Sequence, residues 1–276
     1  MKQVRLGNTI LGDGRVKICL PLVGKNRSEI VEQMYTVTKH EPDVIEFRAD
    51  WYESVFEKAK LHAVLEEVRQ MAGGIPILFT FRSKNEGGEH SISWDAYQEL
   101  NLYVAQQGLA EAVDVEAFFN YEAVTGKVLT EEGQDGMAVH RMETYRDENG
   151  IGQLINRLQQ YGVKVIASNH DFEKTPVEEQ MLARLVCMQN MGADIAKLAV
   201  MPCDSEDVLS VLCTTRKAVQ KCCEIPVITM AMGRLGAVTR LSGELFGSVL
   251  TFASAGKTSA PGQIEIEQLR GILNLL

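Results

Sequence analysis

The stretch from residue 163 to residue 202 reads VKVIASNHDFEKTPVEEQMLARLVCMQNMGADIAKLAVMP. Two apolar runs of strand length, residues 163–168 and 195–200, flank a segment of helical composition. This order predicts a strand, a helix and a second strand, the unit from which parallel sheets are built. We expect the helix to begin with Thr175 as its N-cap and Pro176 at its first position.

Lys197 lies in the middle of the second apolar run, and His170 directly follows the first. Burying an ammonium group disfavours its charged form, so a lysine inside an apolar strand is costly unless a site uses it. An amine with a lowered pKa is also a nucleophile. Lys197 and His170 are therefore the first candidates for catalysis.

The same alternation of apolar runs and helical patterns extends over the whole chain of 276 residues. Strands are expected at residues 16–22, 44–48, 75–81, 113–118, 163–168, 195–200, 226–230 and 249–253, each followed by a helix. Eight such units predict an α/β fold of the closed (β/α)8 TIM barrel type. A doubly wound open sheet is the alternative, but the turn after the first strand, VGKNRS, lacks its glycine fingerprint.

Two segments depart from the repeat. Residues 2–14 are predicted to form a β-hairpin ahead of the barrel. Residues 120–150 are irregular and rich in Glu, Asp and Gly. The whole chain, residues 1–276, is otherwise expected to be a single barrel domain.

Composition excludes several classes of partner. The formal net charge of −9 argues against nucleic acid and against an anionic membrane surface. The chain has no apolar run near the ~20 residues of a membrane span, and the first ten residues lack the core of a signal peptide. The cysteines follow no metal-binding spacing, which is typical of reduced thiols in a cytoplasmic protein; they are Cys19, Cys187, Cys203, Cys213, Cys222 and Cys223.

In a barrel the active site lies at the carboxyl ends of the strands, where this chain has many polar residues. The candidates there are Glu46, Arg48, Arg82, Glu86, Asp114, Glu116, His170, Lys197, Met230, Met232 and Arg240. Structural explanations stay open for several of them. Glu46 and Arg48 fit an ion pair within the barrel, Asp114 and Glu116 fit a structural role, and the two methionines fit core filling.

Six longer motifs carry a resemblance to a known family. They are VIEFRADW at 44–51, LFTFRSKNEGG at 78–88, SNHDFEKTP at 168–176, GADIAKLAVMP at 192–202, PVITMAMG at 226–233 and SAPGQI at 259–264. With these motifs the chain resembles type I 3-dehydroquinate dehydratase, the Schiff-base class of 3-dehydroquinase in the shikimate pathway. The resemblance extends over nearly the whole chain. It departs around residues 120–150, a segment longer than expected of the family, and we interpret it as a family-atypical insertion.

The resemblance implies a hydro-lyase that converts 3-dehydroquinate to 3-dehydroshikimate and water, without a metal or an organic cofactor. It also implies a homodimer. By position, Lys197 corresponds to the Schiff-base lysine, His170 to the general acid and base, and Glu86 to the residue that orients this histidine. The remaining site residues correspond to substrate contacts: Arg240 to the carboxylate, Glu46, Arg48 and Arg82 to the hydroxyls and the reacting end, Met230 and Met232 to the wall, and Ser259 and Gln263 to a loop that closes the site.

Two other functions stay open at this point. A class I aldolase on the same barrel also uses a lysine on the sixth strand, although Arg240 and the SAPGQ loop suit a carboxylate better than a sugar phosphate. A non-catalytic barrel that binds a small acid is the other alternative. The sequence does not decide between aromatic biosynthesis and quinate breakdown.

Overall fold

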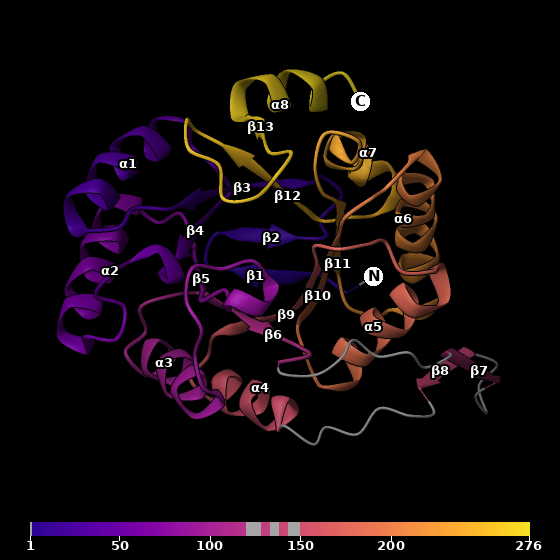
Figure 1. Cartoon of the computed structure of the whole chain (residues 1–276), viewed down its shortest axis with the longest axis horizontal. Coiled ribbons are helices and arrows are strands. Elements are labelled where there is room, and N and C mark those ends of the chain that lie inside the picture. Colours follow the sequence, from indigo (N-terminus) through magenta and orange to yellow (C-terminus); the bar gives the residue numbers. More distant parts are fainter. Residues whose placement is uncertain (1, 120–127, 133–137, 143–149) are drawn as a thin grey trace.

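The computed structural model describes residues 2–119, 128–132, 138–142 and 150–276. In these parts of the chain, eight parallel strands form a ring (Figure 1). They are β3 (Lys17–Leu22), β4 (Val44–Arg48), β5 (Ile77–Thr80), β6 (Ala112–Glu116), β9 (Lys164–Asp171), β10 (Ile195–Val200), β11 (Val227–Ala231) and β12 (Leu250–Ser254). Each strand from β3 to β10 pairs in parallel with the next in this series, and β12 pairs with β3.

The ring closes between β11 and β12. A parallel bridge joins Val227 to Ser248, and the backbone N–H of Val249 donates to the carbonyl of Val227 at 3.0 Å. A short strand, β13 (Ile264–Glu265), pairs in parallel with the carboxyl end of β12. The predicted barrel is therefore confirmed, and the open doubly wound sheet is excluded.

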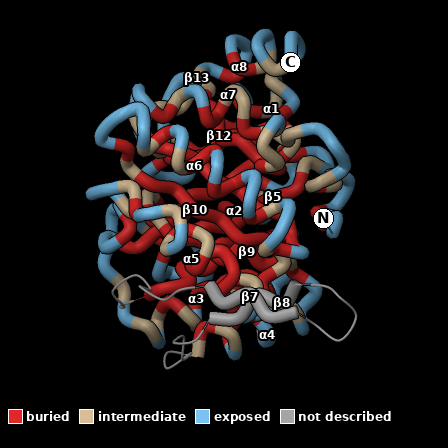
Figure 2. Tube along the Cα trace, turned by 90° about the vertical axis from the view of Figure 1, so that its right-hand side faces the viewer, coloured by how far each residue is buried: buried red, intermediate tan, exposed pale blue. Residues whose placement is uncertain are grey.

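Helices surround the ring of strands and cover its outer surface (Figure 1). Among the described residues they are α1 (Arg27–Lys39), α2 (Lys58–Ala72), α3 (Trp94–Gln106), α4 (Ile151–Gln160), α5 (Glu178–Asn190), α6 (Ser205–Lys217), α7 (Ala237–Phe246) and α8 (Ile266–Leu273). Most of the helices pack an apolar face on the strands, whereas the buried residues of α7 are Thr239, Arg240 and Gly243. The buried residues concentrate in the centre of the molecule (Figure 2). The short 3-10 turns η1 (Ala49–Trp51) and η2 (Lys84–Glu86) follow β4 and β5.

The predicted start of α5 is wrong. This helix begins at Glu178 with Val177 as its N-cap, and no side chain caps it. The Thr175 hydroxyl instead donates to the carbonyl of Met201 at 3.1 Å. A tertiary hydrogen bond to the end of β10 therefore competes successfully with the local capping interaction that the sequence favours.

The predicted N-terminal hairpin is present and blocks one end of the barrel. It consists of β1 (Val4–Leu6) and β2 (Thr9–Leu11), paired antiparallel. The hairpin lies within the ring of strands in Figure 1. Its buried side chains pack with barrel residues near the amino ends of the strands, among them Val44, Ala112 and Ile195. The carboxyl ends are therefore the end that is left for a ligand.

The segment at residues 120–150 lies largely outside the described residues. Within it the structure describes two strands, β7 (Val128–Glu132) and β8 (Ala138–Met142), which pair antiparallel and contact α5. The interpretation of this segment as an atypical insertion into a single domain stays a prediction.

Candidate active site

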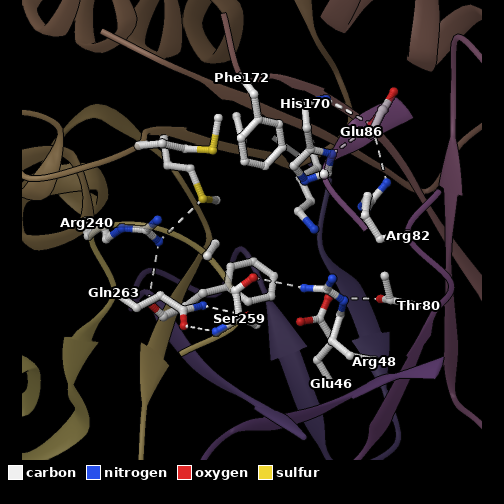
Figure 3. A pocket seen from close by; sticks show the side chains of 17 residues that line it. Glu46, Arg48, Thr80, Arg82, Glu86, His170, Phe172, Arg240, Ser259 and Gln263 are labelled. Atoms are coloured by element: carbon white, nitrogen blue, oxygen red, sulfur yellow. Dashed lines mark hydrogen bonds and ion pairs between the residues drawn. The ribbon is translucent and has the colours of Figure 1, made fainter. Parts of the chain in front are cut away.

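One cavity, open to solvent at its mouth, lies at the carboxyl ends of the barrel strands (Figure 3). All of the residues that the resemblance assigns to the site line it. They are Glu46, Arg48, Arg82, Glu86, His170, Lys197, Met230, Met232, Arg240, Ser259 and Gln263. Alternate residues of a strand face the same side, so Glu46 and Arg48 of β4 both point inward.

Lys197 is buried, with 4% of its surface exposed, and its ammonium has an anionic partner. Its Nζ lies 3.1 Å from Oδ2 of Asp114 and 4.6 Å from the centre of the Phe252 ring. The other carboxylate oxygen of Asp114 accepts hydrogen bonds from Arg82 at 2.7 Å and Ser168 at 2.6 Å. Asp114 therefore holds the lysine at a defined position on the cavity wall.

Asp114 is ionised in this environment. Burial alone raises the pKa of its carboxyl, but the charges of Arg82 and Lys197 outweigh burial and lower the pKa to about 2. From the sequence we interpreted Asp114 as a structural residue, and its contact with Lys197 was not predicted. The only sequence signal is a polar residue within an apolar strand, the same signal that identifies Lys197.

His170 is held by Glu86. Its Nδ1 lies 2.8 Å from Oε2 of Glu86, and its backbone N–H donates to the same oxygen at 3.0 Å (Figure 3). Burial lowers the pKa of His170 well below its usual value, and the nearby charges of Arg82 and Lys197 add to the effect. Burial raises the pKa of the Glu86 carboxyl well above its usual value, and the negative charge of Glu116 raises it further. The imidazole is consequently neutral near pH 7, and a proton on Nδ1 leaves a lone pair on Nε2.

Arg82 connects the lysine and the histidine. Its guanidinium lies 2.7 Å from Asp114, 3.1 Å from Glu116 and 3.3 Å from Glu86. Burial lowers the pKa of Arg82, but these three carboxylates reverse the effect and raise it well above its usual value. Arg82 is thus a permanent cation among three acidic groups, and most of its donors already have partners in the protein.

The ion pair between Glu46 and Arg48, which the sequence left open as a structural explanation, is not formed. Arg48 instead makes two hydrogen bonds of 2.8 Å to Asp50, which follows β4 in η1. Glu46 accepts a hydrogen bond from the Thr80 hydroxyl at 2.9 Å. Asp50 pairs with Arg48 because the turn after β4 brings the carboxylate of Asp50 beside the guanidinium. The carboxylate of Glu46 is turned toward β5 instead.

Arg240 is a buried cation without a carboxylate partner among the described residues. It is 2% exposed and donates to the carbonyls of Pro261 at 3.2 Å and Phe252 at 3.5 Å. Its Nε has no hydrogen-bond partner in the described structure. Burial lowers the pKa of Arg240 to about 10. A desolvated guanidinium that faces a cavity in this state is suited to bind an anion.

The loop before β13 lies at the mouth of this cavity. Gln263 accepts from the backbone N–H of Ser259 at 2.8 Å and donates to its hydroxyl at 2.9 Å. Arg48 reaches the loop with a 3.1 Å hydrogen bond to the carbonyl of Ser259. Gly262 has a φ of +79°, and a Cβ there would lie 2.3 Å from the carbonyl oxygen of Gly233. Only glycine therefore allows this loop to pack so closely.

Several lining residues were not predicted from the sequence. They are Thr80, Gly87, Phe172, Ala199, Phe252 and Ala260. Most are small or apolar, so no chemical signal distinguishes them from core residues. Among the described residues, no group of three or more histidines, cysteines or carboxylates is arranged to hold a metal ion. In the same parts of the chain, no helix has the length and apolar character needed to cross a membrane.

Comparison with known proteins gives consistent matches over almost the entire chain. The family model described as type I 3-dehydroquinase matches residues 18–276. The 3-dehydroquinate dehydratase of Clostridium kluyveri is 40% identical over 273 residues, which cover 99% of this chain and 97% of the relative. The matched range includes all of the predicted cavity residues from Glu46 to Gln263.

Solved structures give the same result. The type I 3-dehydroquinate dehydratase from Clostridium difficile with covalent modified comenic acid is 40% identical, with a TM-score of 0.86, and the match covers 99% of this chain and 97% of that one. The 3-dehydroquinate dehydratase from Geobacillus kaustophilus is 34% identical, also with a TM-score of 0.86, over 100% and 96% of the two chains.

Proposed function

The chain belongs to the type I 3-dehydroquinase family, and from this premise we propose that it removes water from 3-dehydroquinate through an imine on Lys197. A 3-dehydroquinate dehydratase is a hydro-lyase. This function replaces the two alternatives from the sequence, a class I aldolase and a non-catalytic barrel that binds a small acid. One observation carries the proposed mechanism. A buried amine, held by Asp114, and a neutral imidazole, held by Glu86, face the same cavity from the neighbouring strands β10 and β9.

Lys197 supplies the nucleophile. After losing a proton, its amine adds to the substrate ketone, and the resulting carbinolamine loses water to give an iminium ion. The positive nitrogen formed there stays close to the ionised carboxylate of Asp114, which lies 3.1 Å from Nζ in the free protein. The iminium withdraws electrons, so the proton on the adjacent carbon becomes more acidic.

His170 carries out the proton transfers. Its neutral imidazole accepts the proton next to the iminium, and the electron pair of the broken C–H bond is stored as an enamine. When the enamine collapses, the C–O bond breaks and the imidazolium returns a proton to the departing hydroxyl, which leaves as water. Glu86 stabilises the transient positive charge on the ring. Hydrolysis of the product iminium releases 3-dehydroshikimate and restores the amine of Lys197.

The other residues bind and orient the substrate. We assign the carboxylate to Arg240, whose guanidinium lacks a carboxylate partner among the described residues. Ser259 and Gln263 cover the bound molecule, and Glu46 and Arg48 contact its hydroxyls. Met230 and Met232 form the apolar wall. Arg82 acts at the reacting end through its contacts with Asp114 and Glu86, because these two carboxylates occupy its donors.

Borohydride trapping tests the assignment of Lys197. Reduction in the presence of 3-dehydroquinate is expected to add mass to the peptide that contains Ala196, Lys197 and Leu198. Lys197→Ala and Lys197→Arg are expected to lose trapping and turnover together, since neither side chain forms an imine. Lys84→Ala, which removes an exposed amine near the mouth, serves as the control with normal trapping. Full activity in either Lys197 variant would overturn the mechanism.

We further propose a cytoplasmic homodimer that acts in the shikimate pathway and binds no nucleic acid or membrane. The resemblance to the family supports the dimer and the pathway, and the net charge of −9 supports the absence of nucleic-acid binding. Light scattering coupled to size exclusion measures the mass in solution, and a monomer at micromolar concentration would contradict the dimer.

A further inference from the structure

A buried arginine lies behind the strand that carries His170. Arg184 belongs to α5 and is 3% exposed. Its Nη1 donates to Oδ1 of Asn169 at 2.9 Å. The two terminal nitrogens also reach Oδ2 of Asp171 at 3.4 and 3.5 Å, which are longer contacts. The short hydrogen bond to Asn169 is thus the best-formed polar contact of this cation.

Asn169 continues the contact toward the cavity. It is buried, and its Nδ2 donates to Oε1 of Glu86 at 3.1 Å. The second carboxylate oxygen of Glu86 lies 2.8 Å from Nδ1 of His170. Neighbouring residues of a strand face opposite sides, so Asn169 and His170 lie on different faces of β9. The amide of Asn169 therefore links α5, outside the ring, to the acid that holds the histidine.

The donor and acceptor groups of the neighbouring residues determine how the amide of Asn169 is oriented. A guanidinium has only donors, so the oxygen of the Asn169 amide must face Arg184. The NH₂ group of the same amide must then face Glu86. If the amide turned over, two donors would meet at Arg184 and an oxygen would face the carboxylate. Arg184 and the carboxylate thus favour the same orientation of the Asn169 amide, and loss of Arg184 removes one of these two constraints.

We propose that Arg184 is a positioning residue that keeps His170 in its catalytic tautomer, acting through Asn169 and Glu86. The inference rests on the proposed role of His170 as the proton-transfer group. With a donor from Asn169 on one oxygen, Glu86 remains an acceptor on the other, and the ring proton stays on Nδ1. The lone pair on Nε2 then faces the cavity, where the substrate proton is removed.

Charged groups from several elements surround this pair. Those that face Glu86 or His170 are Arg48 of β4, Arg82 after β5, Asp114 and Glu116 of β6, Arg184 of α5 and Lys197 of β10. Asp171 of β9 faces Arg184. Removing Arg184 deletes one cation and frees the Asn169 amide to turn its oxygen toward Glu86. Both changes disfavour the ionised carboxylate, so the pKa of Glu86 rises further.

Arg184→Met tests the proposal, because it keeps an unbranched side chain and removes every donor. We expect the acid limb of the kcat profile to move up by about one pH unit and kcat near neutral pH to fall about tenfold. Long-range nitrogen NMR of the ligand-free protein, labelled on histidine, is expected to report a smaller population of the Nδ1–H tautomer of His170. Borohydride trapping on Lys197 is expected to persist, since imine formation does not use this chain of contacts.

Matched variants separate positioning from a structural effect. Arg184→Lys retains a charged donor and is expected to restore most of the wild-type pH profile and tautomer. Asn169→Ala is expected to reproduce the shift of Arg184→Met, and adding the arginine change to it should shift the profile no further. Arg157→Met removes an exposed arginine of α4 and should leave both readouts unchanged.

A folded Arg184→Met protein with the wild-type pH profile and tautomer would overturn the proposal. If Arg184→Met does not fold, Asn169→Ala provides the test. An unchanged tautomer of His170 in Asn169→Ala would then overturn the proposal. Failure of the proposed function has a different signature, namely a wild-type protein that neither turns over 3-dehydroquinate nor traps it. The tautomer measurement still tests Arg184 in that case, because it requires no substrate.

Discussion

Replacing Arg240 with methionine is expected to weaken substrate binding and at the same time stabilise the free protein. Arg240 is 2% exposed and lacks a carboxylate partner among the described residues, so its charge is unfavourable until an anion binds. Methionine is unbranched and fits the same apolar surroundings, which include Met230 and Phe252. The variant therefore removes the cation with little change in packing.

The magnitude follows from the pKa of the guanidinium. Burial lowers it to about 10 from an ordinary value of about 12.5, and at about 1.36 kcal/mol per unit the ionised form costs roughly 3 kcal/mol of folding free energy. Because the pKa is lower in the folded state, this cost is fully present below about pH 10 and disappears only above the unfolded value. Losing the hydrogen bonds to the carbonyls of Phe252 and Pro261 offsets about 1 kcal/mol each. A net gain of about 1 kcal/mol corresponds to a rise in Tm of about 2–4 °C.

The effect on catalysis has the opposite sign. Loss of a charge-assisted contact with the substrate carboxylate is worth about 1.5–3 kcal/mol per hydrogen bond, so kcat/KM is expected to fall by about 10²-fold or more. Scanning calorimetry at pH 7 and initial rates over a range of 3-dehydroquinate concentrations measure the two effects. Arg216→Met, which removes an exposed arginine of α6, is the control for both. A variant with unchanged KM, or one that loses Tm together with activity, would refute the reasoning.

Three further predictions concern the proton-transfer group and the surrounding segments. His170→Ala is expected to abolish turnover while a borohydride-trappable adduct still accumulates on Lys197, and near-normal turnover would assign proton transfer to another residue. The loop at residues 256–263 should exchange its amide protons faster in the free protein than with a non-reactive carboxylate analogue bound, whereas equal protection would argue against a closing loop. Replacing residues 121–149 with a short loop should leave turnover at saturating substrate largely intact, and a folded but inactive product would contradict this interpretation of the segment.

The sequence by itself determined the barrel and most of the cavity lining. Parallel strands alternating with helices place all strand ends at one edge, so the inward-facing polar residues near these ends face the same space. This rule alone brings Glu46, His170 and Lys197 together, although they are separated by as many as 151 positions in the chain. The apolar neighbours of Lys197 also indicated its burial, because they occupy the positions that a strand must bury.

Only the tertiary structure decided which partner each polar group has. Asp114 and Glu116 are equivalent in pattern, and the strand register aligns Glu116 with Ser168 and Lys197. It is nevertheless the carboxylate of Asp114 that lies 3.1 Å from Nζ of Lys197. Arg48 pairs with Asp50 rather than Glu46, and Thr175 bonds Met201 instead of capping its own helix. Arg184 reaches His170 through two intermediaries from different elements. A residue pattern specifies which face a side chain occupies, whereas a hydrogen bond depends on distances of about 3 Å that arise only when distant segments pack together.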